Sequence, residues 1–166
     1  AATKGVELTG LITKNPKRNT MQYTKDELGV LLNGTKPLQL AGHDLSKADL
    51  TEADLSKADL SDANLNGAFL DDARLRYANL SKANLEDASL RKTNLHGATL
   101  VEADLRDVDF RGADLSGAKL NNANLSFANL TDANLAGADL HGAKYNRYTQ
   151  WPAGFELETV GATLVK

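Results

Sequence analysis

The stretch at residues 47–65, KADLTEADLSKADLSDANL, repeats one five-residue unit almost without change. Counted from its leucines, the same spacing runs without an insertion from residue 38 to residue 145. The centre of the unit, position i, is Leu in 20 of 22 units, the exceptions being Phe110 and Tyr145, and position i−2 is Ala in 18 units. Position i−1 is mostly Asp or Asn, and all seven Gly residues of this region stand at i+2.

A strict period of five fits neither a regular helix nor a flat strand. A helix advances about 100° per residue, so successive leucines would lie roughly 140° apart and would form no apolar stripe. In a strand, an odd step would place every second leucine on the opposite face. All leucines can point inward only if the chain turns a corner in each unit, and Gly at i+2 tolerates the dihedral angles of such a turn. The period therefore predicts stacked coils around a Leu and Ala interior.

The tandem motif A-[D/N]-L-x-x, seen in ADLTEADLSKADLSDANL (48–65) and ANLSFANLTDANLAGADL (123–140), resembles the pentapeptide-repeat family. The resemblance implies an all-β solenoid, a right-handed quadrilateral β-helix with four repeats per coil and the i and i−2 side chains inside. On that geometry the 22 repeats make about 5.5 coils,. Coils spaced about 4.8 Å apart would give a rod about 26 Å long.

Three regions are expected along the chain: an N-terminal extension with a capping helix (1–37), the β-helix (38–145) and a C-terminal cap (146–166). Both ends of a stacked coil need a cover, because unpaired backbone and bare leucine would recruit other chains. In TKDELGVLLNG (24–34), Thr24 and Glu27 have the spacing of a capping box, and Gly34 suits the end of a helix,. The leucines of this segment are expected to lie on the first coil.

The segment YNRYTQWPAGF (145–155) contains four of the nine aromatic residues of the chain. Trp151 and Phe155 are expected to fold over the last coil. The run Trp-Pro-x-Gly-Phe is similar to tails that follow the repeats in cyanobacterial and plant members of the family.

No arrangement of residues in the sequence predicts catalysis. The absence of Cys excludes disulfides, thiolate nucleophiles and Cys-based zinc sites,. On the coil geometry, His43, His96 and His141 do not converge. The Asp and Asn residues at i−1 are better explained by bonds to nearby backbone than by a cation ladder. Neither a phosphate-binding glycine loop nor a nucleophile motif occurs. The chain is therefore predicted to be no enzyme and to have no cofactor and no metal site.

Three outward aromatic residues suggest a partner surface. Phe69 occupies an i−1 position, and Tyr77 and Phe127 occupy i+2 positions. Large exposed aromatic side chains mark protein interfaces. On the coil geometry the three do not share one column, so scattered surface apolarity is the other interpretation. The preferred function is a non-enzymatic structural or protein-interaction solenoid with an unidentified protein partner.

The alternative function is a DNA-mimicking gyrase-binding protein of the quinolone-resistance type, because some family members imitate duplex DNA. Residues 41–145 carry 17 acidic and 11 basic side chains, whereas duplex DNA of the same length would carry roughly 15 negative charges,. Eight of these acids, but only two of the bases, lie within residues 41–72. A mimic should spread its negative field along a face, so this distribution disfavours mimicry. No face concentrates basic and aromatic residues, which disfavours nucleic-acid binding.

Location and oligomeric state stay open at this point. No run of 18 apolar residues occurs, so no membrane insertion is expected. The sequence begins AATKG without an initiator Met, which suggests a processed or trimmed chain. The compartment is the cytoplasm or, if a signal peptide has been removed, the periplasm or the thylakoid lumen. Covered ends favour a monomer, but family members that dimerise through a terminal coil keep an end-to-end dimer open.

Overall fold

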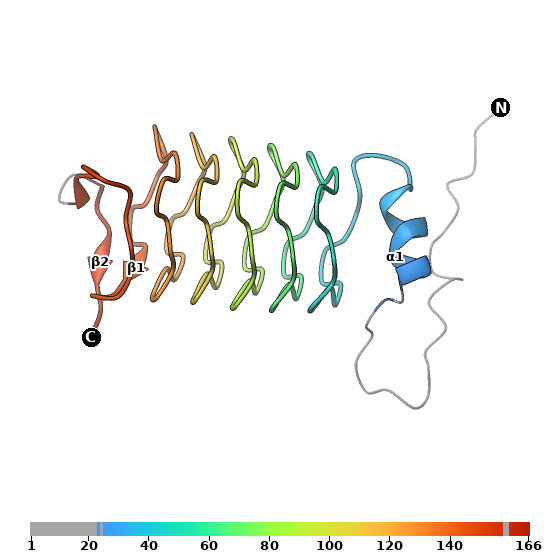
Figure 1. The fold of residues 1–166 in the computed structure, drawn as a ribbon, viewed down its shortest axis with the longest axis horizontal. Helices are drawn as coiled ribbons and strands as arrows, with labels where there is room; N and C mark the ends of the chain where they lie inside the picture. The colour runs from blue at the N-terminus through green and yellow to red at the C-terminus, as the bar shows by residue number, and fades with distance from the viewer. Residues whose placement is uncertain (1–22, 24, 158–159) are drawn as a thin grey trace.

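The computed structural model describes residues 23, 25–157 and 160–166. Its elements are helix α1 (Lys25–Leu32) and strands β1 (Lys144–Tyr145) and β2 (Thr163–Leu164). Between α1 and β1 the chain winds into a stack of similar coils, with α1 at one end of an elongated body and β1 and β2 at the other (Figure 1). Among the described residues, no helix has the length and apolar character needed to span a membrane.

Parallel bridges between units that are four apart in the sequence hold the coils together. Asp49 bridges Phe69, Phe69 bridges Ser89, and the same step joins the i−1 residues on the other sides of the stack. Because each residue pairs with its counterpart four units further along, four units complete one coil. The amide of Leu50 donates to the carbonyl of Phe69 at 2.7 Å, and the amide of Phe69 donates to the carbonyl of Ala48 at 2.9 Å. This pattern defines a solenoid in which every coil shares backbone hydrogen bonds with the coils on both sides.

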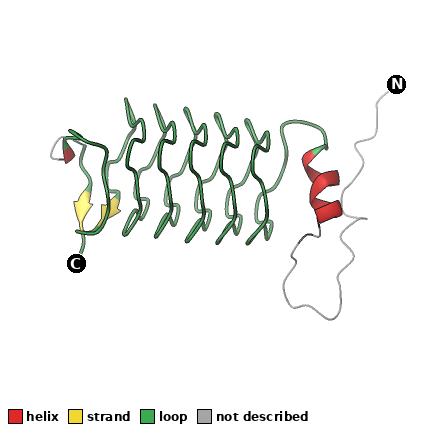
Figure 2. Cartoon of the chain, viewed as in Figure 1, coloured by secondary structure: helices red, strands yellow, loops and turns green. Residues whose placement is uncertain are grey.

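The sides of the solenoid are isolated bridges rather than continuous strands (Figure 2). Because every unit turns a corner, only one residue on each side of a coil, the i−1 residue, forms a bridge with the next coil. Each side is therefore too short to form a continuous strand. At all but one of these corners the amide of i+3 donates to the carbonyl of i, as from Ala53 to Leu50 at 3.0 Å. Every i+2 residue from position 42 to position 142 has positive φ, the geometry of a type II turn,.

Gly occupies only seven of these corners, and the other 14 carry side chains at φ values between 55° and 64°. Left-handed backbone is unfavourable for residues with a Cβ, and least so for Asn and Asp. The corners nevertheless hold several Lys and Glu residues and two aromatic residues, Tyr77 and Phe127. The stacked hydrogen bonds therefore impose the corner geometry on whichever residue stands there.

Asp and Asn at i−1 stabilise the corner that follows them. The Asp49 carboxylate accepts a hydrogen bond from the amide of Thr51 at 3.2 Å, and Asp59 accepts from both the amide and the hydroxyl of Ser61, at 3.1 and 2.7 Å. The same bond from i+1 to i−1 recurs along the stack. The prediction that these short polar side chains bond nearby backbone is confirmed. Each such bond gives a partner to the i+1 amide, which does not take part in the hydrogen bonds between coils.

The interior of the stack is a continuous column of Leu at i and Ala at i−2, most of them fully buried. Phe110 takes the place of a Leu and is also fully buried. Thr93 takes the place of an Ala, and its buried hydroxyl donates to the carbonyl of Leu70 at 2.6 Å, so that no polar group is left unpaired there,.

Apolar side chains from outside the repeats lie at both ends of this column. At the first coil, Leu28 and Leu31 of α1 are buried in the core, and Leu32 packs against it. Thr24, half of the predicted capping box, lies outside the described residues. The amide of Gly34 donates to the carbonyl of Leu31 at 3.1 Å. Gly34 is not among the residues with positive φ, so the helix ends without a left-handed glycine.

At the last coil, Trp151 and Phe155 pack against the core and stack on each other, with ring centroids 5.2 Å apart. The edge of Trp151 also meets the ring of Tyr145 at 5.6 Å. Strand β2 adds a final parallel pairing, with Lys144 opposite Thr163.

Replacing Leu90 by Asp tests the buried column. Leu90 is completely buried in the middle of the stack. The substitution should lower the free energy of unfolding by roughly 3–5 kcal/mol, because it removes a buried apolar side chain and buries an unpaired charge. Chemical denaturation followed by far-ultraviolet circular dichroism measures this. Lys92→Asp, at the neighbouring exposed corner, is the control and should change the value by no more than about 0.5 kcal/mol. Equal effects of the two variants would contradict the fold.

Replacing Lys57 by Gly tests the imposed corner geometry. Lys57 is exposed and has a φ of 60°. Gly should raise the free energy of unfolding by up to about 1 kcal/mol, because the relief of left-handed strain exceeds the entropy that Gly adds to the unfolded chain. Thr51→Gly, at an i+1 position without positive φ, should lower it by about 0.5–1 kcal/mol. The two signs, read from urea denaturation, must be opposite.

Candidate protein-interaction surface

Each unit presents the side chains at i−1, i+1 and i+2 to solvent, and the three predicted partner residues are among the most exposed apolar groups of the described chain. Phe69, Tyr77 and Phe127 expose 53%, 53% and 47% of their surface, respectively. The structure does not bring them together: none of the aromatic contacts among the described residues joins two of the three. They stand at three different positions around the coil, as the five-residue count predicts.

Tyr77 lies in a cationic environment. Its ring meets the edge of His96 at 5.4 Å, and the guanidinium of Arg76 lies 5.7 Å from its centroid. The ring also extends over the next coil at Gly97, where an added Cβ would come within 2.6 Å of it. Gly97 thus makes room for the ring of Tyr77, which stays half-exposed.

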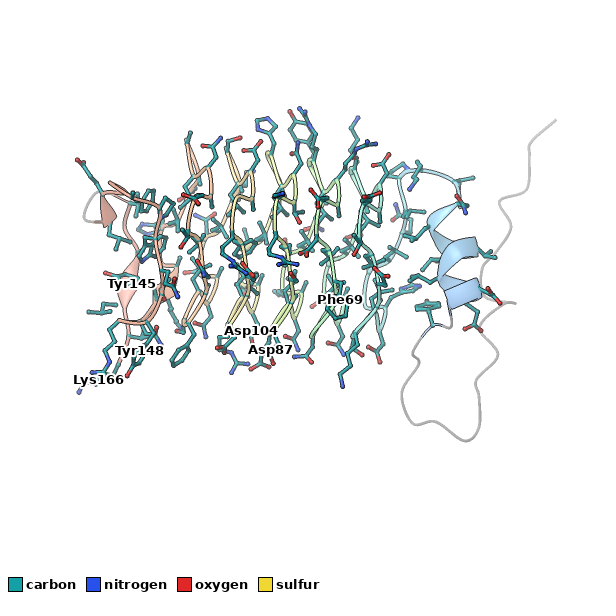
Figure 3. All side chains as sticks on the ribbon, in the orientation of Figure 1. Phe69, Asp87, Asp104, Tyr145, Tyr148 and Lys166 are labelled. Atoms are coloured by element: carbon teal, nitrogen blue, oxygen red, sulfur yellow. The ribbon has the colours of Figure 1, made fainter. Side chains whose placement is uncertain are left out.

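Phe127 belongs to a stacked aromatic pair that the sequence did not predict. Its ring lies parallel to that of Tyr148 at 5.3 Å, and Tyr148 is 52% exposed. The buried side chain of Asn146 accepts hydrogen bonds from the amides of both aromatic residues, each at 3.1 Å. The guanidinium of Arg147 covers the Tyr148 ring at 4.7 Å. Figure 3 shows Tyr148 at the C-terminal end of the stack, near Lys166.

A change of register explains why Tyr148 was missed. Continued in steps of four units, the repeat would place Arg147 above Phe127. The bridge between Asn129 and Gln150 instead spans one residue more than the bridges before it, so an extra residue enters the chain after Tyr145 and brings Tyr148 into line. Only the cluster of aromatic residues in 145–155 hinted at this contact.

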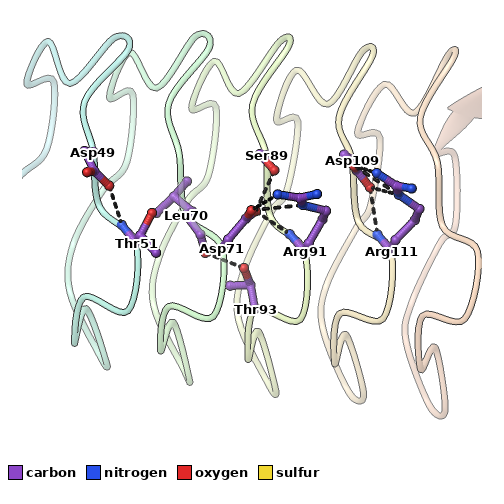
Figure 4. Close-up of polar contacts among 9 residues, drawn as sticks. All are labelled: Asp49, Thr51, Leu70, Asp71, Ser89, Arg91, Thr93, Asp109 and Arg111. Atoms are coloured by element: carbon purple, nitrogen blue, oxygen red, sulfur yellow. Dashed lines mark hydrogen bonds and ion pairs between the residues drawn. The ribbon is translucent and has the colours of Figure 1, made fainter.

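Three arginine residues on the sides of the solenoid, Arg91, Arg106 and Arg111, are paired with carboxylates. Figure 4 shows Asp71 accepting from the side chain of Arg91 at 2.9 Å, from the Arg91 amide at 3.0 Å and from the hydroxyl of Ser89 at 2.5 Å. One coil further on, Asp109 accepts from the side chain and the amide of Arg111, at 2.9 and 3.1 Å. Asp71 thus supplies an acceptor to an amide whose own i−1 residue is Ser rather than Asp or Asn.

These contacts shift the ionisation of Asp71. Burial opposes its charged form, but the hydrogen bonds from Arg91 and Ser89 outweigh burial and hold the pKa of the carboxyl below its usual value. For Asp109, the hydrogen bond from Arg111 is the main cause of a lowered pKa. Both carboxylates are thereby kept ionised, and their oxygens are bound by side chains of the same protein, which is typical of a structural role.

The described residues do not bring together donors suited to a metal. His43 stacks on Tyr23 at 6.1 Å, and the ring of His96 contacts the hydroxyl of Ser116 at 2.8 Å. His141 lies beside Gly161, near the C-terminus. No group of three or more His, Asp or Glu side chains in the described part of the chain has the arrangement of a metal site.

Replacing Asp71 by Asn tests the paired carboxylate through pH. Because the pKa of Asp71 is lowered in the folded state, its contribution to stability is present above its unfolded pKa of about 3.9 and is lost as the pH falls through the lowered folded value,. Asp71→Asn should therefore lower the melting temperature at pH 7 and have progressively less effect in acid. The adjacent Asp72 forms no ion pair among the described residues, so Asp72→Asn is the control and should change the melting temperature at pH 7 much less than Asp71→Asn. A difference at pH 7 that persists unchanged at pH 2 would contradict the assignment.

The family model of pentapeptide repeats matches residues 39–67, 68–107 and 109–144, in eight copies. A search of curated protein sequences finds no match to the chain.

Three of the solved structures that resemble the chain are the following. A pentapeptide repeat protein from Nostoc Pcc 7120 is 42% identical, covering 68% of this chain and 84% of that one, with a TM-score of 0.26. A pentapeptide repeat protein from the Arabidopsis thaliana thylakoid lumen is 26% identical, covering 87% and 68%, with a TM-score of 0.39. QnrB1, a plasmid-mediated fluoroquinolone resistance protein, is 15% identical, covering 77% and 92%, with a TM-score of 0.37.

These TM-scores are low, so the family of the chain is assigned from the match of its repeats and not from the similarity of the structures. The family model matches more than half of the chain, over the same residues that form the coils described above. The chain therefore belongs to the pentapeptide-repeat family.

Proposed function

We propose that this chain is a non-enzymatic solenoid that binds a protein partner through outward aromatic side chains. The observation that carries the proposal is the stacked pair of Phe127 and Tyr148, each about half exposed at 47% and 52%. Aromatic residues with this degree of exposure are anchors in many interfaces, because they bury a large area and lose little conformational entropy.

The backbone at these positions supports a role beyond stability. Tyr77 and Phe127 both stand at corners with positive φ, of 56° and 64°. A bulky residue there is unfavourable, and Gly occupies the same kind of corner at positions 67 and 97,. Half of each ring faces water, so burial offsets only part of that cost. Strained backbone positions are frequent at functional sites, and among the 14 corners with positive φ that carry a side chain only these two hold aromatic residues,.

The proposal includes the finer features of the fold. We infer a right-handed quadrilateral β-helix of about 5.5 coils, with the chain divided at 1–37, 38–145 and 146–166; the bridges between units four apart support four units per coil,. Helix α1 and the segment around Trp151 and Phe155 are inferred to close its two ends, since their apolar side chains pack on the core. Closed ends leave the sides as the surfaces for binding.

The gyrase-binding alternative has less support. The arginine residues of the middle coils, Arg91, Arg106 and Arg111, all pair with carboxylates. On these coils the paired carboxylates are neutralised locally, which interrupts the continuous negative face that mimicry of DNA would need,. The likeness to QnrB1 is too distant to transfer a partner.

Affinity capture tests the proposed function. Tagged wild-type protein and the variants Phe69→Ser, Tyr77→Ser, Phe127→Ser and Tyr148→Ser are incubated with an extract of the source organism, and retained proteins are quantified by mass spectrometry. At least one partner should be lost from the Phe127 and Tyr148 variants, because both rings belong to one surface. Asp132→Ser, at another exposed corner, is the control and should retain it. If a variant with all four substitutions keeps its fold and every partner of the wild type, the proposed function is wrong.

A further inference from the structure

We propose that one edge of the solenoid, formed by Asp87, Asp107, Phe127 and Tyr148, binds an extended segment of a partner protein in which a Lys or Arg lies close to an apolar side chain. We refer to these four residues as the acidic–aromatic edge. The inference deepens the proposed function, on which it rests, by naming the surface and the chemistry of the partner.

The four residues form a continuous line because they occupy the same corner of successive coils. The amide of Asp87 donates to the carbonyl of Arg106, and the amide of Asp107 donates to the carbonyl of Ser126, both at 3.1 Å. Tyr148 continues the line through its stacking on Phe127. With about 4.8 Å between coils, the edge is about 14 Å long, and the two carboxylates lie about one and two coils from the Phe127 ring. Figure 3 shows Asp87 and Tyr148 along the same margin of the stack.

The two carboxylates of this edge are exposed and lack an ion pair among the described residues, unlike Asp71, Asp104 and Asp109. Arg91, the arginine nearest in sequence to Asp87, is engaged by Asp71 at 2.5 Å. Arg106 directly precedes Asp107, but its guanidinium is engaged by Asp104 at 2.6 Å and by Glu86 at 3.1 Å. Asp87 and Asp107 are therefore available to a cation from another molecule.

The aromatic end of the edge is rigid and faces solvent. Phe127 has a φ of 64° at a corner where Gly67, on the same line, takes a φ of 63° without a Cβ. The two rings are held parallel, within 10° of each other, by stacking and by the Asn146 side chain. A preorganised apolar pair next to unpaired carboxylates complements a segment with one apolar and one cationic group.

Spacing and charge define the orientation of the partner segment. In an extended chain, side chains on one face recur about every 6.6–6.8 Å, so a Lys or Arg two or four residues from an apolar side chain lies on the same face and can span the distance between ring and carboxylate. Arg147 lies over the outer face of the Tyr148 ring, so a cation is repelled from that end. The cationic residue is therefore directed to Asp87 and Asp107, and the apolar residue to Phe127.

The corner at Tyr77 offers a matched control. Tyr77 has the same left-handed backbone and a similar exposure, 53% against 47% for Phe127. Its neighbours are Arg76 and His96 rather than carboxylates. It should not bind the same segments.

The experiment uses a random peptide library displayed on phage and selected against the immobilised full chain. Enriched sequences should contain Lys or Arg two or four residues from an aromatic or aliphatic residue. The most enriched sequence, made as a fluorescent peptide, is then measured by anisotropy. Asp87→Asn with Asp107→Asn, and separately Phe127→Gly, should each weaken binding about tenfold or more, whereas Tyr77→Gly and Asp72→Asn should change it less than about twofold. Circular dichroism melting verifies that each variant is folded.

Three results would overturn the inference: no enrichment, enrichment of acidic or uncharged sequences, or binding that the edge variants leave unchanged. The proposed function fails separately. A cellular partner that is lost from the Phe127→Ser and Tyr148→Ser variants but retained by Asp87→Asn with Asp107→Asn would refute the basic segment and leave the aromatic interaction surface standing.

Discussion

Each coil exchanges backbone hydrogen bonds with the next at a step of four units, and the other features of the solenoid follow from this pairing. Leu50 donates forward to Phe69, and Phe69 donates back to Ala48. A coil can make these bonds only if it closes after four units, and it closes only if every unit turns a corner. The corner in turn places its i+2 residue in left-handed backbone, whether that residue is Gly97 or Phe127. Local strain at the corners is thus offset by pairing between coils.

The pairing between coils separates the interior from the surface. The interior accepts little besides Leu and Ala, and where Thr93 intrudes its hydroxyl must find the carbonyl of Leu70. The surface is organised by short contacts: i−1 carboxylates and amides hold the corner amides, and arginines pair with carboxylates such as Asp71 and Asp109. A surface organised in this way can change its outer residues without disturbing the core, which suits a protein that presents a rigid binding face.

On such a scaffold, we expect function where a residue does not suit the backbone conformation of its position or departs from the charge pairing seen on the other coils. Phe127 is an aromatic residue at a left-handed corner, half-exposed and stacked on Tyr148. Among the described residues neither Asp87 nor Asp107 forms an ion pair, unlike the carboxylates that pair with Arg91, Arg106 and Arg111. These departures coincide on one edge, and that coincidence distinguishes it from Phe69, which contacts no other aromatic ring among the described residues, and from Tyr77, which lies beside Arg76 and His96.

The amino-acid pattern was enough to predict the coiled path, the identity of the buried column, the corner at each i+2 position and the role of Asp and Asn at i−1. These features repeat every five residues, so each depends on contacts within a unit or on a regular step between units. The pairing of Asp71 with Arg91 and the stacking of Phe127 on Tyr148 became visible only in the folded chain. The first joins side chains on adjacent coils, and a period shows which positions stack but not which side chains will bond. The second requires the extra residue after Tyr145, and once the repeat ends no periodicity remains to set the register.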